Sequence, residues 1–318
     1  MSFSESDFLR LLEARAREAA GPDILLGIGD DAALLDAEGR VISLTTDMAL
    51  DGIDFRLEEC GYRRAGRKAM AKNLSDIAAM GVEPWCCFVS VALPGGAGPG
   101  DGRELLEGLV GLAESFDCVV AGGDTKRSPG PLVLNVAVAG RSGTAPAVRR
   151  SGARAGDSLF VTGRLGGSML GHHLSFTPRV LEGLLLNQRY RPSAMIDLSD
   201  GLAADLPRLC RASGVGAVLQ AESIPVSPDA ARAGRADGRE GLLHALLDGE
   251  DYELLFALPP GRASELLADP DLGPLISRIG GCTDPGQGCR ISREGLESPL
   301  PAGGFEHSFD AGDAGDKR

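Results

Sequence analysis

Residues 194–202 read AMIDLSDGL, where a short apolar segment ends in two aspartates, a serine and a glycine. The sequence predicts a strand over Ala194–Asp197, a turn at Asp200-Gly201 and a helix after the turn. Pro207 lies inside that helical pattern and is expected to kink the helix or to move its start. The order of strand, acidic turn and helix indicates an α/β fold.

Four other segments of the chain also place a carboxylate beside Gly, Ser, Thr or Asn. They are GIGDDAALLD from Gly27, TTD from Thr45, NLSDIAAMG from Asn73 and GGDT from Gly122. Small neighbours let the backbone approach a ligand closely, and oxygen ligands suit hard cations such as Mg²⁺. The five motifs together predict a site that holds metal ions against a polyphosphate.

Each motif also has an ordinary structural interpretation. Asp-Gly sequences favour turns, Asp200 fits a helix N-cap, and Asp76 fits a surface ion pair with Lys72 one helical turn away. GGDT is more specific, because two glycines after a strand predicted as buried, Cys118–Ala121, suit close contact with phosphate. The N-cap interpretation of DLSDGL leaves Asp197 unexplained.

Composition limits the class of protein. A chain of 318 residues is long enough for two domains, and 32 Lys and Arg against 45 Asp and Glu give a net charge of −13. This charge argues against nucleic acid or an anionic membrane as partner. Seven cysteines without zinc spacing, and no secretory segment, predict reduced thiols in the cytoplasm. No apolar run reaches the ~20 residues of a membrane span.

Hydrophobic periodicity predicts alternating helices and strands. Helices are expected over about Asp7–Ala20, Tyr62–Met80 and Arg103–Ser115, and after Gly166-Gly167 and Asp200-Gly201. Strands are expected over Val41–Thr46, Val89–Leu93, Cys118–Ala121, Leu132–Ala139, Ser158–Thr162 and Ala194–Asp197. A segment around 141–156 without clear periodicity places a domain boundary near residue 147, which gives domains over 1–147 and 148–309 and a disordered tail over 310–318.

The motifs, in this order, resemble those of the thiamine-monophosphate kinase family, in the superfamily that includes aminoimidazole ribonucleotide synthetase. GEDYEL from Gly249 and GGFEHSF from Gly303 extend the resemblance over nearly the whole chain. It implies a two-domain α/β fold, with an N-terminal sheet that dimerises into a barrel and a C-terminal α/β domain. The implied reaction is direct in-line transfer of the γ-phosphoryl group of ATP to thiamine monophosphate in a homodimer, with several Mg²⁺ ions bound.

The resemblance also assigns roles to residues. The implied metal ligands are Asp30, Asp31, Thr45, Thr46, Asp47, Asp76, Asp124, Asp197 and Asp200. Asp47, Asp124 and Asp200 are expected to be catalytic. The implied ATP contacts are Gly123, Asp124, Arg150 and Ser199, and the implied substrate contacts are Asp54, Glu250 and Phe305.

Position 54 departs from the family pattern, which usually has histidine there. An aspartate would attract the cationic thiazolium ring but repel the substrate phosphate. Asp54 is therefore expected to need a screening cation if it faces the substrate. The candidates near it in the sequence are Arg56, Arg63, Arg64 and Arg67.

Other functions remain as alternatives. A selenophosphate synthetase would need a reactive cysteine near its N-terminus, whereas the first cysteine here is Cys60. An aminoimidazole ribonucleotide synthetase would carry glutamate at position 124, and a hydrogenase-maturation enzyme would end in cysteine rather than Gly-Asp-Lys-Arg. A non-catalytic nucleotide-binding assembly protein would be expected to lack metal carboxylates, and the motifs here retain theirs.

Overall fold

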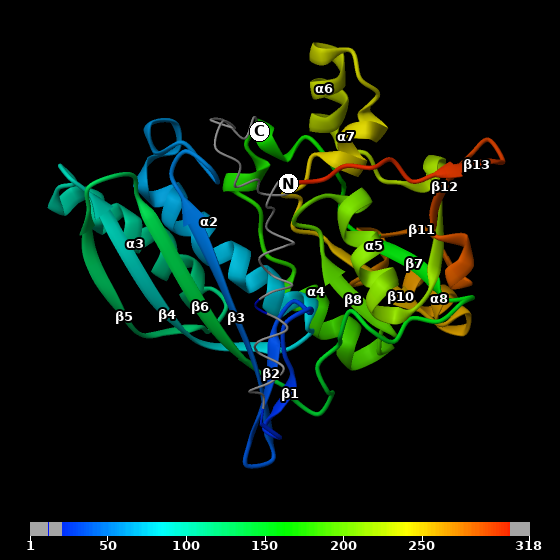
Figure 1. The fold of residues 1–318 in the computed structure, drawn as a ribbon, viewed down its shortest axis with the longest axis horizontal. Coiled ribbons are helices and arrows are strands. Elements are labelled where there is room, and N and C mark those ends of the chain that lie inside the picture. The colour runs from blue at the N-terminus through cyan, green and yellow to red at the C-terminus, as the bar shows by residue number, and fades with distance from the viewer. Residues whose placement is uncertain (1–11, 13–20, 306–318) are drawn as a thin grey trace.

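The structure, a computed structural model, describes residue 12 and residues 21–305. The helix predicted over about 7–20 and the tail predicted over 310–318 lie outside these residues. Two mixed β-sheets stand side by side with helices packed against them (Figure 1). The helices are α2 (Leu57–Ala79), α3 (Pro99–Glu114), α4 (Val180–Leu185), α5 (Leu202–Ser213), α6 (Pro228–Asp237), α7 (Gly241–Leu247) and α8 (Pro260–Leu267).

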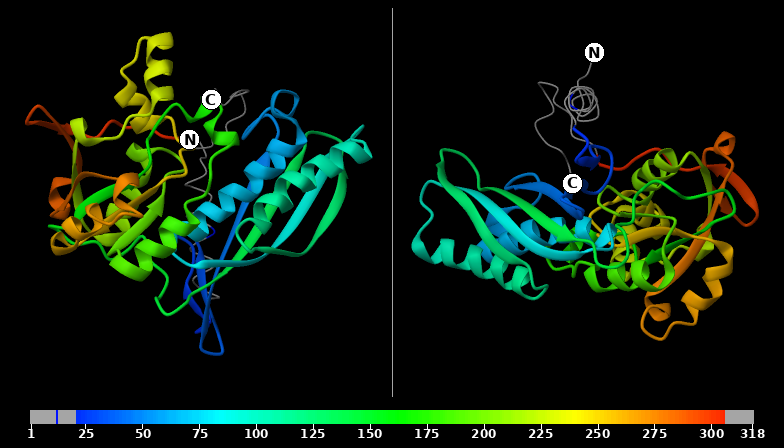
Figure 2. Two further views of the ribbon diagram at one scale, coloured as in Figure 1. Left: turned by 180° about the vertical axis from the view of Figure 1, so that it is seen from behind. Right: turned by 90° about the horizontal axis from the view of Figure 1, so that it is seen from below.

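The first sheet is formed by residues before the linker at about 142–157. In the described residues it has six strands in the order β1-β2-β3-β6-β4-β5, and only β4 and β5 pair in parallel. Its strands are β1 (Ile24–Leu26), β2 (Ala33–Ala37), β3 (Arg40–Leu50), β4 (Glu83–Pro94), β5 (Val119–Ser128) and β6 (Val133–Arg141). Helices α2 and α3 lie against one face of this sheet, and none of the other described helices covers the opposite face (Figure 2).

The second sheet follows the linker. Among the described residues it has seven strands in the order β13-β12-β9-β11-β7-β10-β8. Its strands are β7 (Ser158–Thr162), β8 (Ala194–Asp197), β9 (Gly216–Gln220), β10 (Leu254–Leu258), β11 (Ile276–Thr283), β12 (Cys289–Arg293) and β13 (Leu296–Pro299). The two-domain α/β prediction is confirmed, while the exact domain limits near residue 147 stay a prediction.

Several predicted elements match and others differ. β7 and β8 have the predicted ends, and α5 runs through Pro207 from Leu202 to Ser213. The helix predicted after Gly166-Gly167 is present as α4, but it begins only at Val180, because the segment that follows the two glycines forms short 3₁₀ turns at 168–170 and 172–174. The strand predicted as buried before GGDT is also wrong in part: Cys118 is buried, but Val119 and Val120 are exposed on an edge strand.

Helix α2 is held tightly in place at both its start and its middle. The side chain of Asp51 accepts a hydrogen bond of 2.8 Å from the Leu57 N–H, which has no partner inside the helix. Gly66 of α2 and Gly108 of α3 let the helices touch, since a Cβ at these positions would lie 2.3 Å and 1.9 Å from backbone oxygens of the other helix. The polar residues on α2 are therefore fixed relative to the sheet.

The apolar core explains why α2 is central to the molecule. Leu74 and Ile77 of α2 belong to one buried cluster with Phe160 and Phe256, which come from the second sheet and stack with ring centres 5.4 Å apart. The second apolar cluster lies beneath α5, on the other side of that sheet. Because α2 is buried by both halves, its polar side chains lie at their junction. None of the described helices is long and apolar enough to span a membrane.

Candidate metal and phosphate site

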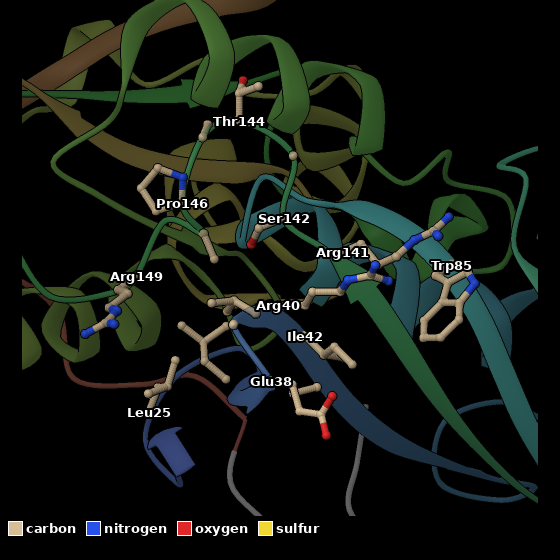
Figure 3. A pocket seen from close by; sticks show the side chains of 17 residues that line it. Leu25, Glu38, Arg40, Ile42, Trp85, Arg141, Ser142, Thr144, Pro146 and Arg149 are labelled. Carbon is tan, nitrogen blue, oxygen red and sulfur yellow. The ribbon is translucent and has the colours of Figure 1, made fainter. Parts of the chain in front are cut away.

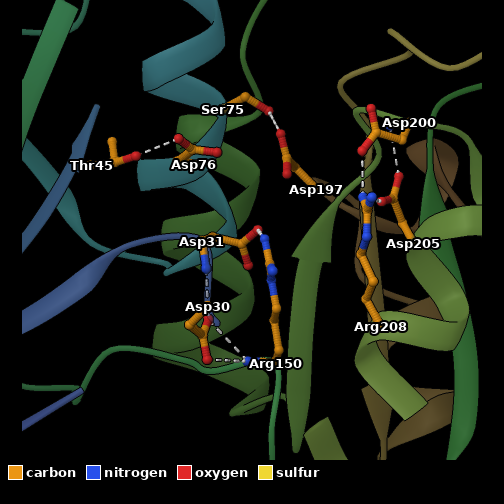
Figure 4. A network of polar contacts seen from close by, with 10 residues as sticks. All are labelled: Asp30, Asp31, Thr45, Ser75, Asp76, Arg150, Asp197, Asp200, Asp205 and Arg208. Carbon is orange, nitrogen blue, oxygen red and sulfur yellow. Dashed lines mark hydrogen bonds and ion pairs between the residues drawn. The ribbon is translucent and has the colours of Figure 1, made fainter. Parts of the chain in front are cut away.

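Three predicted ligands meet at the junction of the two halves. Carboxylate oxygens of Asp31, Asp76 and Asp197 all lie within 4.8 Å of one another (Figure 4). Asp31 precedes β2, Asp76 lies on α2, and Asp197 ends β8. Burial raises the pKa values of Asp76 and Asp197 well above the usual 3.8, and the neighbouring carboxylates raise them further. The surroundings of Asp76 and Asp197 therefore favour either a bound proton or a bound cation.

The carboxylate oxygens of the cluster, and the hydrogen bonds that orient them, suit a hard divalent cation. Each carboxylate has one oxygen held by a protein donor: Arg150 Nη2 at 2.6 Å from Asp31, the Thr45 hydroxyl at 2.5 Å from Asp76, and the Ser75 hydroxyl at 2.6 Å from Asp197. The second oxygen of Asp31 is buried and has no hydrogen-bond partner. A buried carboxylate oxygen without a donor is costly, and oxygen-only ligand sets suit Mg²⁺. The site therefore matches the predicted metal chemistry.

The TTD motif is divided between two faces of the sheet. The sequence predicts TTD at the end of a strand, whereas β3 continues to Leu50 and places TTD in its middle. Side chains alternate along a strand, so Thr45 lies on the face that α2 covers and Thr46 lies on the exposed face. The Thr46 hydroxyl donates to Val136 O at 3.1 Å or Asn135 Oδ1 at 3.2 Å. The structure thus does not bring the Thr46 side chain to the cluster.

Asp47 lies on the same face as Thr45 and close to the cluster. Its backbone N–H donates to Asn73 Oδ1 at 3.1 Å. Burial raises the pKa of Asp47, Lys72 lowers it, and Asp54 and Asp200 raise it again, so these charges surround it. The charge of Asp47 also raises the pKa of Asp76. Asp47 therefore connects the three-carboxylate cluster with the residues around Asp200.

Asp30 supports the arginine beside the cluster. Its carboxylate accepts the Arg150 backbone N–H at 3.0 Å and the Asp31 N–H at 3.0 Å. Burial, followed by the charge of Asp31, raises the pKa of Asp30 to about 6. Asp30 is outside the group of three, and the hydrogen bonds show it fixing the backbone that presents Arg150. A role for Asp30 as a metal ligand stays a prediction.

The DLSDGL and GEDYEL motifs lie against each other. The Glu250 N–H donates to Ser199 O at 2.7 Å, and the Tyr252 N–H donates to Leu198 O at 2.8 Å. Glu250 and Tyr252 both have positive φ, near 54° and 51°, which side chains other than glycine rarely adopt. This strained loop holds Glu250 beside Ser199, a predicted ATP contact.

Two further predicted residues join the same region. Asp200 forms an ion pair with Arg208 of α5, which also binds Asp205 at 2.6 Å (Figure 4). The Phe305 N–H donates to Asp200 O at 3.3 Å, so the chain returns to this site at Phe305. Asp200, Glu250 and Phe305, which are far apart in the sequence, are thus gathered around one loop.

Asp54 and Glu250 are each paired with a lysine of α2. Lys72 Nζ lies 2.9 Å from Asp54 Oδ1, and Lys68 Nζ lies 2.6 Å from Glu250 Oε2. The cation that screens Asp54 is therefore Lys72, and none of the four arginines proposed from the sequence pairs with it. The alternative interpretation of Asp76 as a surface partner of Lys72 is not supported, because Asp76 faces Thr45 and the carboxylate cluster.

GGDT lies apart from the other motifs. Gly123 and Asp124 are inside β5, the edge strand of the first sheet, and not after it. The Asp124 carboxylate is 62% exposed and lies 3.3 Å from Lys126. By strand register Asp124 is opposite Ser90, which faces away from α2 and α3. A single chain thus does not bring Asp124 to the carboxylate cluster.

Sequence reasoning missed the donors that orient the site. Ser75 donates to Asp197 across the junction, and Arg208 and Lys68 pair with Asp200 and Glu250. The available signal was on α2, where Lys68, Lys72, Asn73, Ser75 and Asp76 interrupt a run of small apolar residues. Polar residues on a helix this deeply buried must find partners, which marks them as part of a site.

A separate cavity of about 980 Å³ lies beside the linker (Figure 3). Its lining includes Arg40, Trp85, Arg141 and Arg149, and the Arg141 guanidinium lies 5.0 Å from the Trp85 ring centre. None of the predicted metal, ATP or substrate residues lines this cavity. The acidic chemistry of the chain is therefore located at the junction and not here.

Comparison with known proteins gives a consistent picture. The chain matches the N-terminal domain of AIR synthase related proteins over residues 29–142 and their C-terminal domain over residues 128–288. The thiamine-monophosphate kinase of Rhodopirellula baltica is 40% identical over 316 residues, which cover 97% of this chain and 96% of the relative. That of Salmonella typhimurium is 34% identical and covers 90% and 92%. The structure of AaThiL complexed with AMPPCP and TMP has a TM-score of 0.81 at 27% identity, covering 96% of this chain and 97% of that one.

Proposed function

Since the chain belongs to the thiamine-monophosphate kinase family, we propose that it transfers the γ-phosphoryl group of ATP to the phosphate of thiamine monophosphate, giving thiamine diphosphate and ADP. The observation that carries the proposal is the convergence of Asp31, Asp76 and Asp197 from three separate segments. Those carboxylates are the ones that family resemblance assigns to metal binding. Their placement at the junction leaves both halves of the molecule able to contact the substrates.

We infer that Mg²⁺ is held by Asp31, Asp76 and Asp197, with Asp47 and Asp200 beside them. Bound Mg²⁺ would neutralise phosphate charge and orient the transferring group. Thr45 and Ser75 orient Asp76 and Asp197 by donating to one oxygen of each. Arg150, fixed through Asp30, presents a guanidinium that can bind a phosphate oxygen of ATP. Asp124 remains a proposed metal ligand and catalytic residue. Thr46 remains a proposed metal ligand.

We infer direct transfer, without a phosphorylated enzyme. The acceptor is itself a phosphate oxygen that attacks in line, and positioning plus charge compensation is the chemistry the site residues support. Ser199 and Gly123 are proposed ATP contacts, and Glu250 and Phe305 are proposed substrate contacts. Phe305 could pack on the thiamine rings, and the Glu250 carboxylate is paired with Lys68 of the other half.

We also infer a homodimer that forms through the exposed face of the first sheet. Leu44 and Met48 of β3, Phe88 of β4 and Val119 of β5 are large apolar side chains that remain exposed in the single chain. Several large apolar side chains on one exposed sheet face are typical of an interface. Asp124 lies on the same exposed side, so a second copy packed there is the arrangement that would bring Gly123 and Asp124 near bound phosphates.

A cytoplasmic location, where ATP is available and the seven cysteines stay reduced, is part of the same proposal.

The test is direct. Purified protein is incubated with ATP, Mg²⁺ and thiamine monophosphate, and thiamine diphosphate is measured by chromatography. Parallel reactions replace thiamine monophosphate with thiamine, or omit Mg²⁺. Thiamine diphosphate formed only in the complete reaction supports the proposal. ATP consumption with no thiamine diphosphate would contradict it.

A further inference from the structure

Lys72 differs from the other buried lysine of α2 in how its ammonium group is used. Lys68 is 0% exposed, and its three N–H groups have three acceptors: Asp54 O, His173 Nδ1 at 2.9 Å and Glu250 Oε2 at 2.6 Å. Lys72 donates to Asp54 Oδ1 at 2.9 Å and to Met48 O at 3.0 Å. Its third N–H has no acceptor among the residues that the structure describes. Lys72 therefore keeps one donor for a ligand.

The surroundings of Lys72 place it between the two parts of the site. Burial lowers the pKa of Lys72, but the charges of Asp47, Asp54 and Glu250 outweigh this effect and raise it above its usual value. Asp47 lies beside the metal carboxylates, and Glu250 is a proposed substrate contact. The Lys72 ammonium thus lies between the place proposed for metal-bound phosphate and the place proposed for thiamine.

Both carboxylate oxygens of Asp54 are bound by groups of the protein. One of its carboxylate oxygens binds Lys72, and the other accepts the Leu50 N–H at 2.8 Å. The residue is only 8% exposed. These bonds fix the turn after β3 and, through it, the position of the Lys72 ammonium. Asp54 is therefore poorly placed to contact a substrate itself.

We propose that Lys72 binds the phosphate group of thiamine monophosphate, and that Asp54 is a positioning residue that holds Lys72. This inference rests on the proposed function and adds a residue that binds the acceptor phosphate. Two anionic phosphates must approach each other near several carboxylates, and a fixed ammonium offsets the repulsion on the acceptor side. The ion pair also explains how an acidic residue can occupy position 54. The negative charge of Asp54 is compensated by Lys72, and its carboxylate does not face the substrate phosphate.

The experiment compares two ligands that differ by one phosphate. Calorimetric titration in the presence of Mg²⁺, without nucleotide, gives the affinities of wild-type protein and Lys72→Met for thiamine monophosphate and for thiamine. A charge-assisted hydrogen bond predicts that Lys72→Met weakens thiamine monophosphate binding by about tenfold or more. Thiamine binding should change less than about twofold, because thiamine lacks the group that Lys72 contacts. Lys72→Arg should restore part of the loss, and Arg293→Met, at an exposed pair far along the chain, is the control for surface charge.

The outcomes separate this inference from the proposed function. Equal affinity of wild type and Lys72→Met for thiamine monophosphate, or a parallel loss for both ligands, would overturn the role of Lys72. Wild-type protein that makes no thiamine diphosphate would instead contradict the proposed function. If Lys72→Met does not fold, the double variant Asp54→Asn with Lys72→Met, which leaves no unpaired carboxylate, is titrated in its place and must show the same selective loss.

Discussion

Lys68 on α2 and Glu250 in the loop before β10 form an ion pair of 2.6 Å that is closed to solvent and joins the two halves of the molecule. Burial lowers the pKa of Lys68, and the charge and hydrogen bond of Glu250 oppose that effect. His173 completes the group, with its Nδ1 atom 3.1 Å from the Glu250 carboxylate. The pair holds a proposed substrate contact in place from the opposite half of the chain.

Lys68→Met should destabilise the fold strongly. The change removes the Lys68 ammonium from the buried Glu250 carboxylate, and breaking a buried ion pair by removing one partner costs about 3–5 kcal/mol. Denaturant unfolding followed by circular dichroism measures the loss. Lys126→Met is the matched control, since its ion pair with Asp124 is largely exposed and should contribute little. A free energy of unfolding that falls no further for Lys68→Met than for Lys126→Met would show that the pair does not hold the halves together.

Stability without metal should fall as the pH rises. Folding raises the pKa of Asp30 from 3.8 to about 6, mainly by burial, and burial also raises the pKa values of Asp76 and Asp197 well above 3.8. Above about pH 4 the unfolded chain releases these protons while the folded chain keeps them. The folded state then binds more protons, so the free energy of unfolding decreases with pH. Melting temperatures measured in EDTA at pH 5, 6.5 and 8 test this expectation.

Added Mg²⁺ should stabilise the protein more at pH 8 than at pH 5. The cation competes with protons for the same carboxylates, so its binding strengthens as they ionise. Melting temperatures with Mg²⁺ are compared with those in choline chloride of equal ionic strength. A gain from Mg²⁺ that is the same at both pH values would argue against a metal at these acids.

Asp76→Asn should separate metal binding from fold stability. Without metal the variant should be at least as stable as wild type at pH 8, because it removes one of three clustered carboxylates. The stabilisation by Mg²⁺ should be lost, and turnover should fall by at least about a hundredfold. Asp284→Asn, at an exposed position, is the control. If Asp76→Asn kept the Mg²⁺-dependent rise in melting temperature, Asp76 would not be a ligand.

Thr45→Val and Thr46→Val should differ in their effects on Mg²⁺ binding and turnover, although the two residues are adjacent. Thr45 donates to the Asp76 carboxylate, so its loss should weaken Mg²⁺ binding and reduce turnover. Thr46 bonds to β6 on the other face of the sheet, so its loss should have the smaller effect on both. The Mg²⁺ dependence of turnover in the two variants is the measurement. Equal losses would mean that strand alternation does not decide which threonine serves the site.

The sequence was sufficient for the kinds of residue at the site and for much of the fold. The acidic motifs predict a metal site, and family resemblance assigns Asp31, Asp76 and Asp197 to it; the structure brings these three carboxylates together. The strands at β7 and β8 were also predicted, because their apolar runs are short and end in turn residues. Patterns of this kind depend only on residues that are neighbours in the sequence, and for this reason they can be predicted from the sequence alone.

Relationships between distant segments could not be predicted in the same way. TTD reads as the end of a strand, but pairing with β6 extends β3 to Leu50 and assigns Thr45 and Thr46 to opposite faces. The spacing of Lys72 and Asp76 along the helix allows an ion pair between them. In the structure, the loop after β3 brings Asp54 to Lys72 instead. Both outcomes depend on tertiary contacts that spacing along one helix or strand does not contain.

Asp54→His should be harmful, although family resemblance at position 54 favours histidine. Lys72 and Asp54 are 14% and 10% exposed, and removing the carboxylate leaves a mostly buried ammonium without its partner. The expected loss in the free energy of unfolding is up to about 3 kcal/mol. Thiamine monophosphate should also bind more weakly, because Lys72 is no longer held toward the phosphate. Denaturant unfolding and calorimetric titration of the same preparations measure both effects.

Two further variants show whether Asp54 acts through Lys72. Asp54→Asn keeps an oxygen that can accept the Leu50 N–H, so its losses should be smaller than those of Asp54→His. In the double variant Asp54→His with Lys72→Met, the stability loss should be less than the sum of the two single losses, since the unpaired ammonium is gone. Additive losses, or an Asp54→His protein that is as stable as wild type and binds thiamine monophosphate at least as tightly, would show that histidine fits this position and that Asp54 does not position Lys72.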